Sequence, residues 1–286
     1  MYAAMRGVTM KSYEEPQEQN GQKRRKKKEK RRSKTANIII NCILVLALLC
    51  FAGSAGYLIK YYYTSYSAQK AISDVAQMIK IENAGETVVE TDAKGEEVVI
   101  DAKYLDLYEK NHDFIGWIEV ADTSLSYPVM YTPDDGEYYL HMNFDKEYDY
   151  SGLPFVDARC NVKDASENII IYGHNMKSKT MFSTLEKYKD KSYLEEHPVI
   201  TFDTIYGSAQ YEIAYVILPT SNSGVYDFID AEDEEAFDNY IKELEALKVY
   251  DTGVSLTRED KLITLSTCEY SQTNGRMVVV AKKITE

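Results

Sequence analysis

A run of 24 residues without a charged side chain, residues 36–59 (ANIIINCILVLALLCFAGSAGYLI), is the strongest constraint in this 286-residue sequence. As an α-helix the run would be about 36 Å long, enough to cross a bilayer core of roughly 30 Å with some tilt. A secretory signal peptide has a shorter apolar region of about 7–15 residues, and a buried core helix rarely lacks polar residues on every face. The run therefore predicts a single transmembrane helix that is retained as an anchor.

The charges on either side of this run predict its orientation. Residues 1–34 carry 12 Lys and Arg against 4 Asp and Glu, whereas the rest of the chain carries 21 against 42. Ten of the basic residues lie within residues 23–34, and the positive-inside rule places such a segment in the cytoplasm. We therefore expect a disordered cytoplasmic tail over residues 1–35, the membrane span over residues 36–59, and the remaining chain outside the cell membrane.

The acidity of the outer part limits its partners and its chemistry. It argues against nucleic acid, and the basic cluster is explained by topology and contact with anionic lipid. Beyond residue 59 the chain has two cysteines, Cys160 and Cys268, too few for a disulfide framework. A single bridge between them stays open as an alternative, and it would remove any thiol nucleophile.

Beyond residue 110 the apolar pattern is that of short strands. Apolar runs separated by turn residues occur at residues 114–120, 125–130, 152–156, 169–172, 199–203, 210–218, 262–267 and 277–282. Short strands with few intervening helices favour a closed or nearly closed β-barrel over a parallel α/β sheet. We therefore expect a mainly β domain over residues 111–286.

Residues 60–110 have a helical pattern with a linker. Residues 61–84 continue as a helix or two, residues 85–101 are acidic with two glycines and are interpreted as a loop, and residues 102–110 form a short helix. The first of these segments carries an apolar stripe that would pack on the globular domain: Ala68, Ile72, Val75 and Ile79.

Two further helices interrupt the strands. One is short, at residues 181–188, and the other is long, at residues 231–250, with acidic residues in its first turn that suit a helix N-terminus. The long helix has apolar residues at helical spacing, which are interpreted as a packing face: Phe237, Tyr240, Ile241, Leu244 and Leu247.

A cysteine ends one apolar run and an arginine begins the next, with a polar loop between them. If these strands pair as antiparallel neighbours, the Arg276 guanidinium could lower the pKa of the Cys268 thiol, donate to an oxyanion or hold a substrate carbonyl. A packing cysteine and an arginine in a surface salt bridge are the alternatives.

The four histidines beyond the membrane run differ in context. His174 directly follows an apolar strand that ends in glycine, so it can face a groove while the strand fixes its backbone. His112 lies in a polar turn, His197 precedes a proline in a loop, and His141 follows a Tyr-Tyr-Leu run where it could simply pack. His174 is therefore the favoured proton carrier, although a structural role stays open.

Several motifs together resemble the class B sortases, membrane-anchored cysteine transpeptidases of Gram-positive bacteria. The run TLSTC at residues 264–268 is followed eight residues later by Arg276, and YGHN lies upstream at residues 172–175. Further similar stretches are GWI at residues 116–118, YPVM at 127–130 and YYL at 138–140, and the helix at 231–250 matches an insertion of class B members before the cysteine strand.

The resemblance implies a sortase-type eight-stranded β-barrel with N-terminal helices, and a role for each matched residue. Cys268 corresponds to the nucleophile, His174 to the general acid and base, and Arg276 to the residue that stabilises the oxyanion and holds substrate. Ser266, Thr267 and Asn175 are candidate substrate-binding residues. No metal or organic cofactor is implied, and the sequence has no Gly-rich phosphate loop, HExxH motif or cysteines at zinc spacing.

The implied reaction transfers a protein from its sorting signal to an amine. Secreted surface proteins with a C-terminal Asn-Pro-x-Thr or similar Pro-x-Thr signal would be cut after threonine through a thioacyl-enzyme. The acceptor would be an amino group of a peptidoglycan precursor. A pilin-polymerising sortase and a non-catalytic membrane-anchored binding domain are the alternatives.

The residue that orients His174 is left open by the sequence. A papain-like enzyme orients its histidine with Asn or Asp, and Asn175 and Asn143 are both candidates for this role here.

Overall fold

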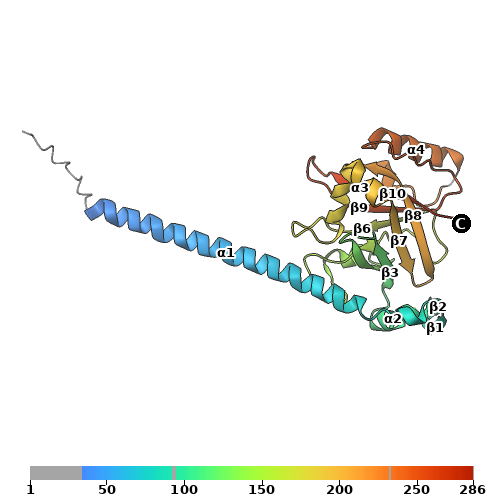
Figure 1. The fold of residues 1–286 in the computed structure, drawn as a ribbon, viewed down its shortest axis with the longest axis horizontal. Helices are drawn as coiled ribbons and strands as arrows, with labels where there is room; N and C mark the ends of the chain where they lie inside the picture. Colours follow the sequence, from blue (N-terminus) through green and yellow to red (C-terminus); the bar gives the residue numbers. More distant parts are fainter. Residues whose placement is uncertain (1–33, 92–94, 232, 286) are drawn as a thin grey trace, which may run out of the picture. The chain divides into compact units, whose positions relative to one another are not determined.

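The computed structural model describes residues 34–91, 95–231 and 233–285 (Figure 1). The chain divides into two compact units, residues 1–55 and residues 56–286. Within the described residues, helix α1 (Lys34–Ala76) is the one helix long and apolar enough to cross a membrane, judged by length and composition. The tail expected to be disordered lies, apart from residues 34 and 35, outside the described residues.

Eight strands of the second unit close into a β-barrel, which confirms the predicted fold class. The strand order around the barrel is β10-β8-β7-β3-β4-β5-β6-β9. Neighbouring strands are antiparallel except for the parallel pairs β4–β5 and β6–β9. The strands are β3 (Phe114–Glu119), β4 (Ser126–Met130), β5 (Phe155–Val156), β6 (Asn168–Tyr172), β7 (Val199–Thr204), β8 (Gly207–Ile217), β9 (Leu262–Cys268) and β10 (Arg276–Lys283).

The continuous apolar run of β10 reflects burial on both faces of the strand. Met277 and Val279 belong to the main core cluster inside the barrel, whereas Val278 and Val280 belong to a second cluster on the other face. Successive side chains of a strand point to opposite faces, so a strand covered on both sides has no polar positions.

Helix α4 (Glu234–Leu247) covers that second cluster, as the sequence predicts. Its packing face is Phe237, Tyr240 and Leu244, which are buried. The helix begins at residue 234, later than expected, because the Asp233 side chain accepts a hydrogen bond from the Ala236 N–H at 2.8 Å and caps the N-terminus.

The helical stripe is confirmed for Ala68, Ile72 and Val75, whereas Ile79 packs on the core beyond the end of α1. The predicted loop at residues 85–101 is wrong. The last turns of α1 bury Ala68, Ile72 and Val75. The segment after it forms the hairpin of β1 (Thr87–Thr91) and β2 (Glu97–Asp101), in which Val98 and Ile100 are buried at alternate positions. Glu97 and Val99 alternate with these buried residues and lie on the exposed face of the strand.

Short helices fill the remaining connections. The expected helix at residues 102–110 is a 3-10 turn, η2 (Ala102–Tyr104), followed by α2 (Leu105–Lys110). The other short elements are η1 (Ile81–Asn83), η3 (Tyr138–His141), η4 (Phe182–Lys189), α3 (Lys191–Glu196) and η5 (Gly224–Tyr226). The helix predicted at residues 181–188 corresponds to η4.

Candidate active site

The barrel topology brings three distant residues to one edge. Because β6 and β9 are parallel neighbours, with Tyr172 opposite Ser266, their carboxyl ends lie together. His174 follows the end of β6, and Cys268 is the last residue of β9. Strand β10 is antiparallel to β9 and begins at Arg276, directly opposite Cys268. The predicted antiparallel pairing of these two strands is confirmed.

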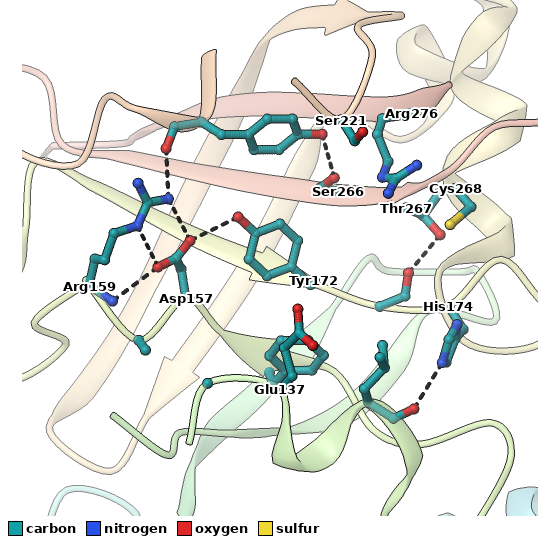
Figure 2. Close-up of a pocket in the computed structure, with 16 residues that line it drawn as sticks. Glu137, Asp157, Arg159, Tyr172, His174, Ser221, Ser266, Thr267, Cys268 and Arg276 are labelled. Carbon is teal, nitrogen blue, oxygen red and sulfur yellow. Dashed lines mark hydrogen bonds and ion pairs between the residues drawn. The ribbon is translucent and has the colours of Figure 1, made fainter. Parts of the chain in front are cut away.

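These residues line a single groove with a volume of about 550 Å³. Figure 2 shows His174, Cys268 and Arg276 at one end of the groove and Asp157 and Arg159 at the other. The remaining lining residues are Gly136, Glu137, Leu140, Phe155, Ala158, Tyr172, Gly173, Ser221, Tyr226, Ser266 and Thr267.

The Cys268 thiol is free and half-buried, and the backbone around it is held by two side-chain hydrogen bonds. The Asn175 side-chain amide donates to the Cys268 carbonyl at 2.8 Å, and the Thr267 hydroxyl donates to the Gly173 carbonyl at 2.7 Å. Both bonds join the end of β9 to the segment that follows β6. Asn175 therefore contacts the cysteine backbone and is not among the residues that line the groove.

The other cysteine of this unit, Cys160, has a different environment. It is free, so there is no Cys160–Cys268 bridge, and only 2% of its surface is exposed. Burial raises the pKa of the Cys160 thiol to about 12, which keeps it protonated and unreactive near neutral pH. Cys268 is the one cysteine among the described residues that lines the groove.

The His174 imidazole is held by a backbone carbonyl. Its Nε2 lies 2.9 Å from the Leu140 carbonyl oxygen; a carbonyl oxygen only accepts, so Nε2 carries the proton and donates. The free nitrogen of the neutral ring is therefore Nδ1. Neither asparagine proposed from the sequence orients the ring, because the amide of Asn175 bonds Cys268 and Glu186 and the Asn143 oxygen accepts from nearby backbone N–H groups.

The surroundings of His174 favour its neutral form. Burial lowers the pKa of His174, the Leu140 carbonyl raises it in part, and the neighbouring His141 lowers it further. The two rings are stacked with centroids 5.4 Å apart. A neutral imidazole with an open Nδ1 is able to accept a proton.

The Arg276 guanidinium has no carboxylate partner within ion-pair distance in the described part of the chain. Its Nη1 donates to the carbonyls of Gly275 at 3.0 Å and Asn274 at 3.4 Å, within its own loop. These bonds leave Nε and Nη2 free to donate to an oxyanion or a carbonyl oxygen. The alternative of an ordinary surface salt bridge is therefore not what the structure shows.

The sequence did not single out the polar cluster at the far end of the groove. Arg159 donates through Nε and Nη2 to the Asp157 carboxylate at 2.9 and 2.7 Å, and the Tyr172 hydroxyl donates to the same carboxylate at 2.8 Å. Burial alone would raise the pKa of Asp157, but these hydrogen bonds outweigh it and lower the pKa. The sequence feature that could have indicated this cluster is the Asp-x-Arg spacing of Asp157 and Arg159 directly after a short strand.

A second missed network supports the cysteine loop. The buried Glu269 carboxylate accepts from Lys189 Nζ at 2.7 Å and from the Ser271 hydroxyl at 2.7 Å. Lys189 also pairs with Glu186, which accepts from the Asn175 amide at 3.1 Å. The loop between β9 and β10 is thus fixed to η4 and to the segment behind the cysteine.

Comparisons with known proteins agree with this geometry. The sortase domain family matches residues 118–284, more than half of the chain. The chain belongs to the sortase family. A sortase B of Listeria monocytogenes is 33% identical over 221 residues, covering 76% of this chain and 85% of that protein. The similarity to sortase B proteins places the chain in class B.

Two solved sortase B structures share the fold of this class B sortase. One, from Bacillus anthracis in complex with AAEK1, has a TM-score of 0.66 at 26% identity and covers 79% of this chain and all of that one. The other is a substrate complex of Staphylococcus aureus sortase B, with a TM-score of 0.61 at 34% identity, covering 65% and 86%. The chain is therefore an enzyme, a cysteine transpeptidase of the sortase B family.

Proposed function

We propose that this class B sortase cleaves a sorting signal of the Asn-Pro-x-Thr or a similar Pro-x-Thr type after the threonine, and transfers the threonine carbonyl to an amino group of a peptidoglycan precursor. The observation that carries the proposal is a groove lined by a free thiol, an imidazole and a guanidinium that has no carboxylate partner among the described residues. The solved substrate complex of the Staphylococcus aureus relative supports a substrate-binding role for this fold.

In the first half-reaction Cys268 is the nucleophile and His174 carries the proton. The thiol proton passes to Nδ1 of His174, because Nε2 is already bonded to the Leu140 carbonyl. The sulfur attacks the threonine carbonyl, whose oxygen becomes an oxyanion that the free N–H groups of Arg276 stabilise. The carbon–nitrogen bond then breaks, the imidazolium protonates the leaving amine, and a thioester remains on Cys268.

The second half-reaction reverses these roles. The acceptor amine attacks the thioester carbonyl and loses a proton to the neutral His174 ring. Arg276 stabilises the second oxyanion, the carbon–sulfur bond breaks, and the proton returns to Cys268. Burial lowers the pKa of His174 and so favours the neutral ring, which is the form that can accept the proton in this step.

The shape and polarity of the groove fit a short extended peptide. Phe155, Tyr172 and Tyr226 supply apolar walls for a proline-containing segment, and Ser266 and Thr267 lie between these walls and the cysteine. We assign Ser266 and Thr267 to the groove floor that contacts substrate. Asn175 acts behind the cysteine, through the Cys268 carbonyl.

The cellular setting follows from the N-terminal helix. We propose that residues 36–59 within α1 anchor the enzyme in the cell membrane, with the basic tail in the cytoplasm and residues 60–286 outside. In this arrangement residues 60–110 connect the anchor to a catalytic barrel over residues 111–286, and the partners are secreted proteins and cell-wall amines.

The test is a cleavage screen of the full-length protein in detergent micelles against Pro-x-Thr-Gly and Pro-x-Thr-Asn peptides. We expect cleavage after threonine, trapping of the acyl-enzyme at Cys268 by mass spectrometry, and loss of both with Cys268→Ala. Adding peptidoglycan stem peptides or a pilin-derived lysine peptide identifies the acceptor class. Cleavage at another bond, or cleavage that persists in Cys268→Ala, would refute the proposal.

A further inference from the structure

A second histidine lies against the proposed proton carrier. The rings of His141 and His174 are stacked, with centroids 5.4 Å apart and an interplanar angle of 22°. The His141 ring also stacks on Tyr150, with centroids 6.0 Å apart and an angle of 16°. Its Nδ1 lies 3.3 Å from the Tyr150 carbonyl oxygen, which only accepts, so Nδ1–H donates. His141 is therefore held by two ring contacts and one hydrogen bond.

Two consecutive residues, Leu140 and His141, contact the edge and one face of the His174 ring. The Leu140 carbonyl accepts the Nε2–H at the edge, and the His141 ring covers one face. The backbone of this pair is itself fixed, because Asp149 N–H donates to the His141 carbonyl at 3.0 Å and Leu153 N–H donates to the Tyr139 carbonyl at 3.0 Å. A single edge hydrogen bond leaves a ring free to tilt about that bond, and the stacked face removes this freedom.

Among the described residues, no acidic group lies within ion-pair distance of the two stacked imidazoles to offset two positive charges. The ionisable side chains in ring contact with His141 are His174, Tyr148 and Tyr150, and tyrosine is uncharged near neutral pH. In the described part of the chain no carboxylate lies within ion-pair distance of either imidazole. The Asp149 side chain bonds Ser151, and Glu137, the residue before η3, lines the groove.

We propose that His141 is a positioning residue for His174, which it holds by ring stacking, and that the two stacked imidazoles carry at most one positive charge between them. Burial lowers the pKa of His174, and a positive charge on the stacked His141 ring lowers it further. That charge opposes a second proton on His174 and keeps its Nδ1 open as a base when the surroundings become acidic. The inference rests on the proton-carrier role proposed for His174.

The experiment separates charge from stacking with two substitutions. His141→Phe keeps a flat ring against His174 but cannot be charged, whereas His141→Ala removes both properties. His112→Phe is the matched control, because the His112 ring also packs on a tyrosine, Tyr108, with centroids 4.9 Å apart. Full-length protein with 13C-labelled histidine, in detergent micelles, is titrated by NMR, and His174→Gln identifies the His174 signal.

The expected results differ between the variants. In His141→Phe the midpoint of the His174 titration rises by about 0.5–1 pH unit, the shift expected for a unit charge at this distance in a partly solvated site. In His141→Ala we expect kcat to fall about tenfold with KM nearly unchanged, since orientation of the base is lost. His112→Phe leaves the His174 titration and the kinetics of the parent unchanged.

The two variants test the two parts of the proposal separately. An unchanged His174 midpoint in His141→Phe would overturn the shared charge, and an unchanged kcat in His141→Ala would overturn the positioning role. If the parent protein cleaves no Pro-x-Thr peptide, the proposed function has failed, but the titration still decides whether the imidazoles are coupled.

Discussion

Arg276 lies directly opposite Cys268 on the neighbouring strand, and the hydrogen bonds of its guanidinium are to carbonyls of its own loop. An arginine that stabilised the fold would pair with a carboxylate on this acidic surface. The open donors of this guanidinium, opposite a free thiol, therefore support the oxyanion role that we propose for Arg276.

Substitution of Arg276 should remove activity without unfolding the protein. Arg276→Ala is expected to lower kcat/KM about 100–1,000-fold, the usual loss for one oxyanion donor. Arg276→Lys should restore only part of this, because an ammonium does not present a planar pair of donors. The thermal midpoint should stay near that of the parent in both variants, measured by circular dichroism; Arg276→Ala with near-normal turnover would refute the assigned role.

The two cysteines of the second unit should react at very different rates. A methanethiosulfonate reagent is expected to label Cys268 in the groove rapidly near pH 7.5, whereas burial and a pKa of about 12 protect Cys160. Peptide mapping by mass spectrometry separates these two sites from Cys42 and Cys50. Cys268→Ala should abolish the rapid phase and Cys160→Ala should leave it intact; first labelling at Cys160 would contradict the structure.

The strand positions and the candidate catalytic residues could be predicted because the sequence patterns that indicate them are local. The apolar runs that end at Cys268 and begin at Arg276 indicate two strands joined by a turn, and these strands pair as expected. The closeness of His174 to Cys268 has no such signal. It depends on the parallel pairing of β6 with β9, whose first residues are 94 positions apart along the chain, and only the resemblance in sequence indicated it.

The contacts that orient the site could not be predicted for a second reason. Every residue has a carbonyl group, so no side-chain pattern marks Leu140 as the partner of His174. The Val-rich hairpin was missed because its acidic residues and glycines are also typical of loops, and the alternation of Val98 and Ile100 is short. In both cases the sequence carried too little local information.

Gly152 should prove essential for the position of His174. The residue has a φ of 53°, and a Cβ there would lie 2.3 Å from the Leu140 oxygen and 2.4 Å from the Tyr139 oxygen. Gly152→Ala must displace the carbonyl that holds the imidazole, so we expect kcat to fall at least about tenfold. Gly253→Ala is the matched control: its φ is 83° with open space around the Cβ, so backbone strain of about 1–2 kcal/mol is expected there without loss of activity. Equal activities of the two variants would show that Gly152 does not support the site.

The buried His174 should also make stability depend on pH. Its pKa in the folded chain is lowered from the ordinary value of 6.5, mainly by burial, so below that pH the unfolded chain binds more protons at this position than the folded chain. The free energy of unfolding must then fall as the pH falls through this range. His174→Gln removes the group, and we expect this variant to lose less stability between pH 8 and pH 5 than the parent, measured by urea unfolding of the full-length protein in detergent. His112→Gln, at an exposed position, should keep the pH dependence of the parent, and a His174→Gln variant with the same dependence would show that the buried imidazole does not contribute to it.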